Sequence, residues 1–175
     1  GGKRDQVDGN SDRATAMREA AEEIGLHADD VSEVLCELER PVAVGGIVTG
    51  VVVASVSPEF TPIANADEVD AVFAMPLRAF VEGGKAWDYR AEDLRPDAAD
   101  NHDTCELLRP IRMHYFTQRG GTLTVANESK ESEYLVWGLT SGILIHVAEL
   151  AFGMPPKFEK DGPMMAPTKP RRAKM

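Results

Sequence analysis

The chain has 175 residues, the usual size of one domain, and 43% of them are hydrophobic, so we expect a folded protein with a core rather than global disorder. The net charge of −10 argues against a general binder of nucleic acid or of an anionic membrane. A bound metal or a few local cations can still create a site for an anionic small molecule. The two cysteines, Cys36 and Cys105, favour unpaired thiols in a reduced compartment.

The first predicted element is a helix that begins after Ser11 and ends before Gly25. Ser11 is a suitable N-cap, and Gly25 can take the left-handed conformation that often closes a helix. Nearly opposite the apolar stripe of this helix, Glu19, Glu22 and Glu23 fall within an arc of about 100°. Such a face can bind a divalent metal through carboxylate oxygens, although an ordinary solvated acidic face has the same pattern. The apolar stripe consists of Ala14, Met17, Ala21 and Ile24.

Strand candidates follow the helix. Residues 31–38 alternate loosely, and residues 42–56 are rich in Val and Ile, so each segment is a predicted strand. Two prolines interrupt the pattern in 57–67, which we expect to be a loop. A third predicted strand covers 68–74, and a short helix over 76–81 starts at a proline.

The second half of the chain contains fewer clear signals. Residues 83–101 are polar and are predicted to be irregular. Strands are predicted over 111–117 and, weakly, over 122–125, with a Gly-Gly turn between them. Residues 134–152 are predicted to contain a helix that starts near Trp137.

This last helix is apolar, but we do not expect it to cross a membrane. The segment Leu139–Met154 is shorter than the about 20 apolar residues of a typical span, and it contains His146 and Glu149. We therefore predict a packed core helix, followed after Pro155 by a flexible tail.

The segment around the acidic helix resembles the Nudix box, the signature of the Nudix hydrolases. The box reads Gly, five residues, Glu, seven residues, Arg-Glu, an apolar residue, any residue, Glu-Glu, any residue, Gly and an apolar residue. Gly2 looks like the first glycine. Asp8 stands where the first Glu usually lies, and nine residues rather than seven separate it from the arginine, so the resemblance assigns no role to Asp8. The second half is matched by Arg18, Glu19, Glu22, Glu23, Gly25 and Leu26.

Three downstream segments resemble the coenzyme A diphosphatase branch of this family. They cover 65–77, Arg112–Phe116 and Tyr134–Thr140. The last three residues are similar to a variant of the peroxisomal C-terminal address and consist of Ala173, Lys174 and Met175. The resemblance implies a peroxisomal import receptor as a partner and a location in the peroxisome or a related organelle, with the cytoplasm or the mitochondrion as alternatives.

The same resemblance implies the fold and its boundaries. The expected fold is an α/β/α sandwich around a mixed sheet, whose first strands would normally precede the segment at the start of this chain. We therefore expect a Nudix domain over 1–158 that lacks its N-terminal strands, which would leave an exposed sheet edge, and a flexible tail over 159–175.

The reaction that the resemblance implies is hydrolysis of the diphosphate of coenzyme A or acyl-coenzyme A. The products would be adenosine 3′,5′-bisphosphate and (acyl-)4′-phosphopantetheine. The implied cofactor is Mg²⁺ or Mn²⁺, because hard cations prefer carboxylate oxygens. The implied metal ligands are Glu19, Glu22 and Glu23, and Arg18 would orient one of these glutamates.

Two roles stay open at this point. The general base is predicted to be Glu22, with Glu68 as the alternative, since some Nudix enzymes take the base from outside the box. Lys3 and Arg4 are candidates for contacts with the phosphates of the substrate, although they could also be simply solvated. No role is assigned to the histidines.

Two alternative functions are consistent with the sequence. One is a Nudix hydrolase of ADP-ribose, NADH or a related nucleoside diphosphate. The other is a catalytically inactive binding module with the Nudix fold. The intact acidic helix favours an active enzyme over the second alternative.

Overall fold

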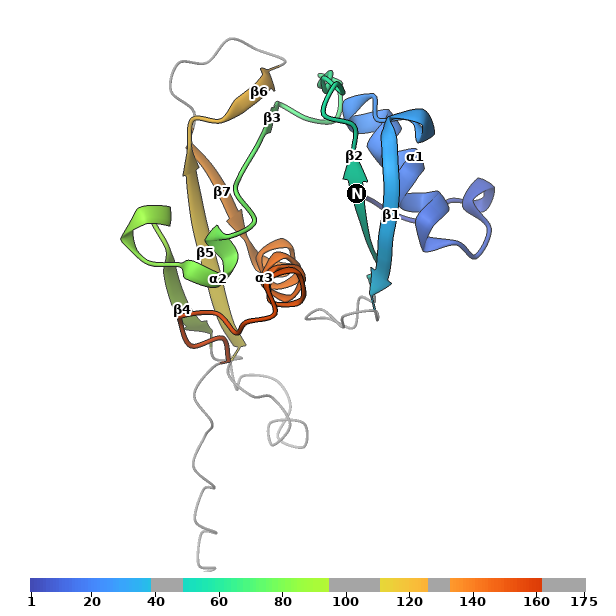
Figure 1. Cartoon of the computed structure of the whole chain (residues 1–175). Coiled ribbons are helices and arrows are strands. Elements are labelled where there is room, and N and C mark those ends of the chain that lie inside the picture. Colours follow the sequence, from blue (N-terminus) through green and yellow to red (C-terminus); the bar gives the residue numbers. More distant parts are fainter. Residues whose placement is uncertain (39–48, 95–110, 126–132, 162–175) are drawn as a thin grey trace, which may run out of the picture. The chain divides into compact units, whose positions relative to one another are not determined.

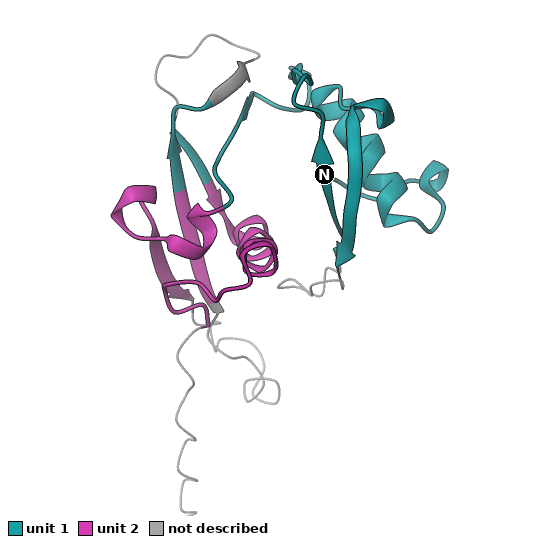
Figure 2. Ribbon diagram, viewed as in Figure 1, with its two compact units in different colours: residues 1–77, 117–135 teal, residues 78–116, 136–175 magenta. Residues whose placement is uncertain are grey.

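The computed structural model describes residues 1–38, 49–94, 111–125 and 133–161, and it confirms the predicted α/β class (Figure 1). The chain divides into two compact units, which are treated separately below (Figure 2). Unit 1 comprises Gly1–Leu77 and Thr117–Leu135, and unit 2 comprises Arg78–Phe116 and Val136–Met175.

In unit 1, helix α1 (Asp12–Ile24) has the ends that its sequence predicts. The side chain of Ser11 accepts a hydrogen bond from the amide of Ala14 at 3.1 Å, and Gly25 closes the helix with φ of 70°. The helix packs on strand β2 (Val51–Val56). Strand β2 pairs antiparallel with β1 (Val31–Leu38), which confirms both predicted strands over the described residues.

A second antiparallel pair in unit 1 joins strand β3 (Ala71–Phe73) to β6 (Thr122–Val125). Strand β3 is shorter than the predicted 68–74, because a turn uses the preceding residues. In that turn the carbonyl of Asn65 accepts hydrogen bonds from the amides of Glu68 and Val69 at 2.9 and 2.8 Å. The backbone of these residues therefore forms a local turn and does not pair with β6.

The main sheet has the strand order β4-β5-β7 and consists of Arg90–Leu94, Ile111–Arg119 and Glu133–Trp137. Strand β4 lies where an irregular segment was predicted, and β7 precedes a helix in a segment predicted as helical. Both differences arise from pairing with β5, a long-range interaction that overrides weak local preferences. Helix α3 (Gly138–Phe152) starts where the sequence predicts, and α2 (Ala79–Glu82) is one turn long.

The hydrophobic core of the described residues lies in unit 2. Phe80 and Phe116 are almost fully buried, with ring centroids 4.7 Å apart. Ser141 of α3 donates a hydrogen bond to the carbonyl of His114 in β5 at 2.9 Å, which joins the helix to the sheet. The buried apolar residues are Ala79, Phe80, Val81, Phe116, Val136, Ile145 and Ala148.

No helix within the described ranges is long and apolar enough to span a membrane. The boundary predicted at residue 158 stays a prediction. The described residues just beyond it contact unit 2: the Glu159 carboxylate lies 2.5 Å from Arg112, and Lys160 Nζ lies 2.7 Å from Glu149.

Candidate functional site

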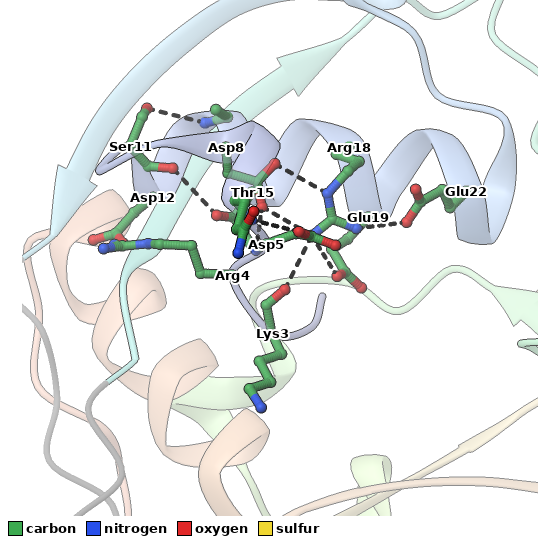
Figure 3. A network of polar contacts seen from close by, with 12 residues as sticks. Lys3, Arg4, Asp5, Asp8, Ser11, Asp12, Thr15, Arg18, Glu19 and Glu22 are labelled. Carbon is green, nitrogen blue, oxygen red and sulfur yellow. Dashed lines mark hydrogen bonds and ion pairs between the residues drawn. The ribbon is translucent and has the colours of Figure 1, made fainter.

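Arg18 lies at the centre of a polar network on the N-terminal side of unit 1 (Figure 3). Its Nε and Nη2 donate to both carboxylate oxygens of Asp8 at 3.0 and 2.9 Å, so this contact is bidentate. Nη1 donates to Glu22 Oε2 at 2.7 Å, and Nη2 lies 2.9 Å from Glu19 Oε1. Nη2 also donates to the carbonyl of Lys3 at 3.0 Å. One guanidinium therefore fixes two glutamates of the acidic face relative to the N-terminal segment.

Asp8 has a role that the sequence left open: it holds Arg18 in place. Its side chain is only 7% exposed and also accepts the amide of Asp5 at 2.9 Å, within a 3₁₀ turn over Gln6–Asp8. The hydrogen bond from Arg18, followed by that from Asp5, lowers the pKa of Asp8 to about 2. The carboxylate therefore stays charged, and its hydrogen bonds raise the pKa of Arg18 further above its normal value.

Gly2 lies directly against the carboxylate of Glu19. A Cβ atom added to Gly2 would lie 2.0 Å from Glu19 Oε2, far inside van der Waals contact. Any larger residue at position 2 would have to displace the Glu19 carboxylate, which Arg18 contacts. This close approach explains why the first position of the motif is a glycine, which has no side chain to collide with the Glu19 carboxylate.

The carboxylates of Glu22 and Glu23 are accessible from solvent. The side chain of Glu23 is 26% exposed and that of Glu22 is 47% exposed. The backbone nitrogen of Gly1 lies 2.9 and 2.7 Å from the two carboxylate oxygens of Glu23. A cation in solution can therefore reach both carboxylates.

A divalent cation fits the chemistry of this cluster, although its carboxylates do not converge. Among the residues that the structure describes, no group of three acidic, His or Cys side chains has the geometry to hold one ion. Arg18 contacts Glu19 and Glu22, whereas Glu23 does not contact it. The three glutamates nevertheless present hard oxygen atoms on neighbouring turns of one helix. With Asp8 included, three carboxylates contact the single guanidinium of Arg18, so the cluster keeps an excess of negative charge.

The two predicted phosphate ligands lie at different places. The guanidinium of Arg4 forms an ion pair with Asp12 at the start of α1. The side chain of Lys3 points away from the acidic cluster, while its backbone carbonyl accepts from Arg18 (Figure 3). Their contacts with a substrate stay predictions.

Glu68, the alternative base, lies in a turn that is attached to the end of α1. The amide of Asn65 donates to the carbonyl of Glu23 at 3.0 Å, and its side-chain Nδ2 donates to the carbonyl of Glu22 at 3.1 Å. Glu68 itself is exposed, and within the described residues its carboxylate forms no hydrogen bond or ion pair. Sequence reasoning assigned nothing to Asn65, although an Asn at the start of Asn-Ala-Asp-Glu is a typical turn signal.

Comparison with known proteins shows what this chain is similar to. No family model matches it. It is 33% identical over 171 residues to "Nudix hydrolase 15, mitochondrial" of Arabidopsis thaliana, covering 93% of this chain and 50% of the relative. It is 34% identical over 161 residues to "Peroxisomal coenzyme A diphosphatase NUDT7" of Mus musculus, covering 92% and 59%. A third relative, "Peroxisomal coenzyme A diphosphatase ndx-8" of Caenorhabditis elegans, is 37% identical over 82 residues, which cover 47% of this chain and 35% of the relative. The chain spans about half the length of the curated relatives that it matches along most of its sequence.

Proposed function

Because this chain is a homologue of the Nudix hydrolases, we propose that it hydrolyses the diphosphate of coenzyme A or of an acyl-coenzyme A. In this reaction the oxygen of water forms a bond to one phosphorus atom, and the bond from that phosphorus to the bridging oxygen breaks. The products are adenosine 3′,5′-bisphosphate and (acyl-)4′-phosphopantetheine. The observation that carries the proposal is the fixed arrangement of Glu19 and Glu22 around Arg18.

In this proposal Glu19, Glu22 and Glu23 would hold a Mg²⁺ or Mn²⁺ ion. A bound ion would neutralise charge on the diphosphate and lower the pKa of a coordinated water. Arg18 is proposed to orient Glu19 and Glu22 rather than contact the substrate, because its Nε, Nη1 and Nη2 atoms all donate hydrogen bonds within the cluster. Asp8 positions Arg18.

The general base is one of two carboxylates. Glu22 is close to the other acidic side chains, but its carboxylate already accepts a hydrogen bond from Arg18 at 2.7 Å. Glu68 has no such partner among the described residues, and its turn is attached to the same end of the helix. The structure therefore supports Glu68 at least as well as Glu22.

Lys3 and Arg4 are proposed to contact the phosphates of the substrate. Both are exposed and lie in the segment that passes the acidic cluster. Arg4 would have to exchange its contact with Asp12 for a phosphate oxygen, and Lys3 would have to turn towards the cluster. A cationic side chain at either place would offset the repulsion between the acidic face and an anionic substrate.

The test is product analysis with coenzyme A, acetyl-coenzyme A, ADP-ribose and NADH, each in the presence of Mg²⁺ or Mn²⁺. We expect adenosine 3′,5′-bisphosphate and a 4′-phosphopantetheine from the first two substrates, and no product when EDTA is added. Turnover of ADP-ribose or NADH without turnover of either coenzyme A substrate would overturn the coenzyme A assignment. The name of the plant relative, which gives only Nudix hydrolase and a location, is compatible with either substrate class.

An inactive binding module is the second alternative, and thermal melting distinguishes it. A ligand that binds the folded state raises the melting temperature by mass action. An active metal-dependent enzyme should show a higher melting temperature with Mn²⁺ than with EDTA. No shift together with no turnover of any of the four substrates would favour the module.

We propose a location in the peroxisome or a related organelle, with an import receptor bound through Ala173, Lys174 and Met175. These residues lie outside the part of the chain that the structure describes. Two relatives are named as peroxisomal and one as mitochondrial, which leaves the mitochondrion and the cytoplasm as alternatives. Deletion of the three residues from a fluorescent fusion should move the protein to the cytoplasm if the address is used.

A further inference from the structure

The C-terminal end of helix α1 is attached to the following loop by three consecutive hydrogen bonds. The carbonyls of the last helical turns normally lack partners within a helix. Here the amide of Ile63 donates to the carbonyl of Ile24 at 3.0 Å, next to the two donors that Asn65 supplies to the carbonyls of Glu22 and Glu23. Two of these three carbonyls belong to proposed metal ligands.

This attachment is more than a helix cap, because α1 already has one. Gly25 takes the left-handed conformation, and its amide donates to the carbonyl of Ala21 at 3.1 Å. The amide of Leu26 donates to the carbonyl of Ala20 at 3.2 Å. The bonds from the loop therefore link the helix to a separate segment of the chain rather than simply ending it.

Asn65 also organises the turn that carries Glu68. Its carbonyl accepts from the amides of Glu68 at 2.9 Å and Val69 at 2.8 Å, and its side-chain Oδ1 accepts from the amide of Asp67 at 3.3 Å. One residue thus bonds to the backbone of two acidic-face residues on one side and to the backbone of Glu68 on the other. The position of Glu68 relative to the acidic face depends on this single residue.

We propose that Asn65 is a positioning residue for the hydrolysis, which holds Glu68 at a fixed place beside Glu22 and Glu23. The inference rests on the proposed function, because it assigns to Glu68 a part in the reaction. Reactive groups must be held to within about 0.5 Å of their productive geometry, and hydrogen bonds from supporting residues provide that precision. Removal of the Asn65 side chain deletes the bond to the Glu22 carbonyl and the bond from the Asp67 amide, so it weakens the attachment of the turn to the helix without changing a side chain of the acidic face.

The test is a double-mutant cycle between Asn65→Ala and Glu68→Gln, measured as kcat and KM. Asn65→Ala should lower kcat by about 10- to 100-fold, the cost of a misplacement of about 1 Å, while KM changes little. Because Asn65 acts through Glu68, the double mutant should be no slower than Glu68→Gln alone. The matched control is Asp67→Asn, which changes an exposed side chain in the same turn and should keep kcat within about twofold.

Two results would overturn the inference in an active enzyme. If the fold-loss of kcat in the double mutant equals the product of the fold-losses in the two single mutants, Asn65 acts independently of Glu68. An unchanged kcat in Glu68→Gln would show that the Glu68 carboxylate has no part in the reaction, so Asn65 would have no reactive group to position. Hydrogen exchange of the amide of residue 67, which donates to the Asn65 side chain, should become faster in Asn65→Ala and stay unchanged in Asp67→Asn.

The cycle also separates failure of this inference from failure of the proposed function. It is run with whichever nucleoside diphosphate the wild-type protein hydrolyses, so loss of the coenzyme A assignment leaves it intact. Additive losses in an active enzyme remove only the role of Asn65. No turnover of any diphosphate by the wild-type protein removes the proposed function and this role with it.

Discussion

The two units differ in what they bury. Among the described residues, the buried polar or charged side chains of unit 1 are Asp8 and Thr15, and both lie at the acidic cluster. Unit 2 buries all seven of the buried hydrophobic side chains, and its aromatic rings pack around Phe116. Apolar burial is the main source of stability, whereas partly exposed ion pairs add little. The comparison indicates that unit 2 contributes most of the stability of the described residues, whereas unit 1 contains the acidic cluster in which we propose the reaction takes place.

This contrast can be measured directly, because both tryptophans of the chain, Trp87 and Trp137, lie in unit 2. Their fluorescence reports mainly on the unfolding of unit 2. Turnover and amide hydrogen exchange of α1 report on unit 1. An effect on α1 can therefore be distinguished from an effect on the core of unit 2.

The largest expected effect is on turnover, in Glu23→Gln. Loss of a ligand carboxylate should remove several kcal/mol of transition-state stabilisation, which corresponds to a fall in kcat of about 10³-fold. Tryptophan fluorescence in urea should stay unchanged, since Glu23 is in unit 1. The matched control is Glu37→Gln, an exposed acid of β1 with the same change of charge, which should keep its rate. A fall of less than tenfold in Glu23→Gln would contradict the metal assignment.

The complementary change is Phe116→Ala in unit 2. Phe116 is fully buried and contacts the rings of Phe80, Tyr89 and Phe158, so its removal should cost about 3–5 kcal/mol of unfolding free energy. We expect a large drop in the urea midpoint of tryptophan fluorescence. The rate per folded molecule should change only slightly, and a rate loss as large as that of Glu23→Gln would break the separation between the units.

A smaller effect is predicted for Asp8→Asn. The Asp8 pKa of about 2 lies below its normal value of 3.8, mainly because of the hydrogen bond from Arg18. The folded state therefore binds fewer protons than the unfolded state between these values, so Asp8 contributes stability above pH 3.8 that is lost as the pH falls towards 2. The protection of the α1 amides from hydrogen exchange, relative to the intrinsic rate at each pH, should decrease over this range in the wild type. In Asp8→Asn this pH dependence should be weaker, and kcat should fall because Arg18 loses its bidentate partner.

The smallest effect is expected from His114, which is 5% exposed in unit 2. Burial lowers its pKa below 6.5, and the groups around it are Tyr89, Arg112, Asp93, Asp161 and the carbonyl of Lys160. Its neutral ring accepts from the Tyr89 hydroxyl at 3.0 Å at Nδ1 and donates to the Lys160 carbonyl at 2.9 Å from Nε2. The unfolded state therefore binds the proton more readily, so the stability of unit 2 is complete above pH 6.5 and falls below it.

The measurement is the urea midpoint of tryptophan fluorescence between about pH 7.5 and pH 5.5. The wild type should lose stability over this range, and His114→Gln should show a flatter dependence from a lower starting value. His146→Gln is the control, because His146 is an exposed histidine of α3 in the same unit. An equal pH slope in wild type and His114→Gln would remove His114 as its cause.

Local signals predicted some elements well and others not at all. Ser11 and Gly25 defined α1 because a cap and a left-handed glycine act within one turn of the chain. Strand β4 was missed because Arg-Ala-Glu-Asp-Leu has no strand pattern of its own and forms a strand only by pairing with β5. The segment over 133–137 was similarly included in a helical segment, since pairing with β5 decides its conformation.

The sequence by itself determined the acidic face of α1, the caps of that helix and the resemblance that the relatives bear out, because these depend on spacing along one helix. The tertiary structure alone decided which distant residues meet this helix. It placed Asp8 on the guanidinium of Arg18 and joined Asn65 to the helix end, through contacts between residues 10 and 43 positions apart. Hydrogen bonds and ion pairs of this kind depend on distance in space, which residue order does not specify beyond a helical turn.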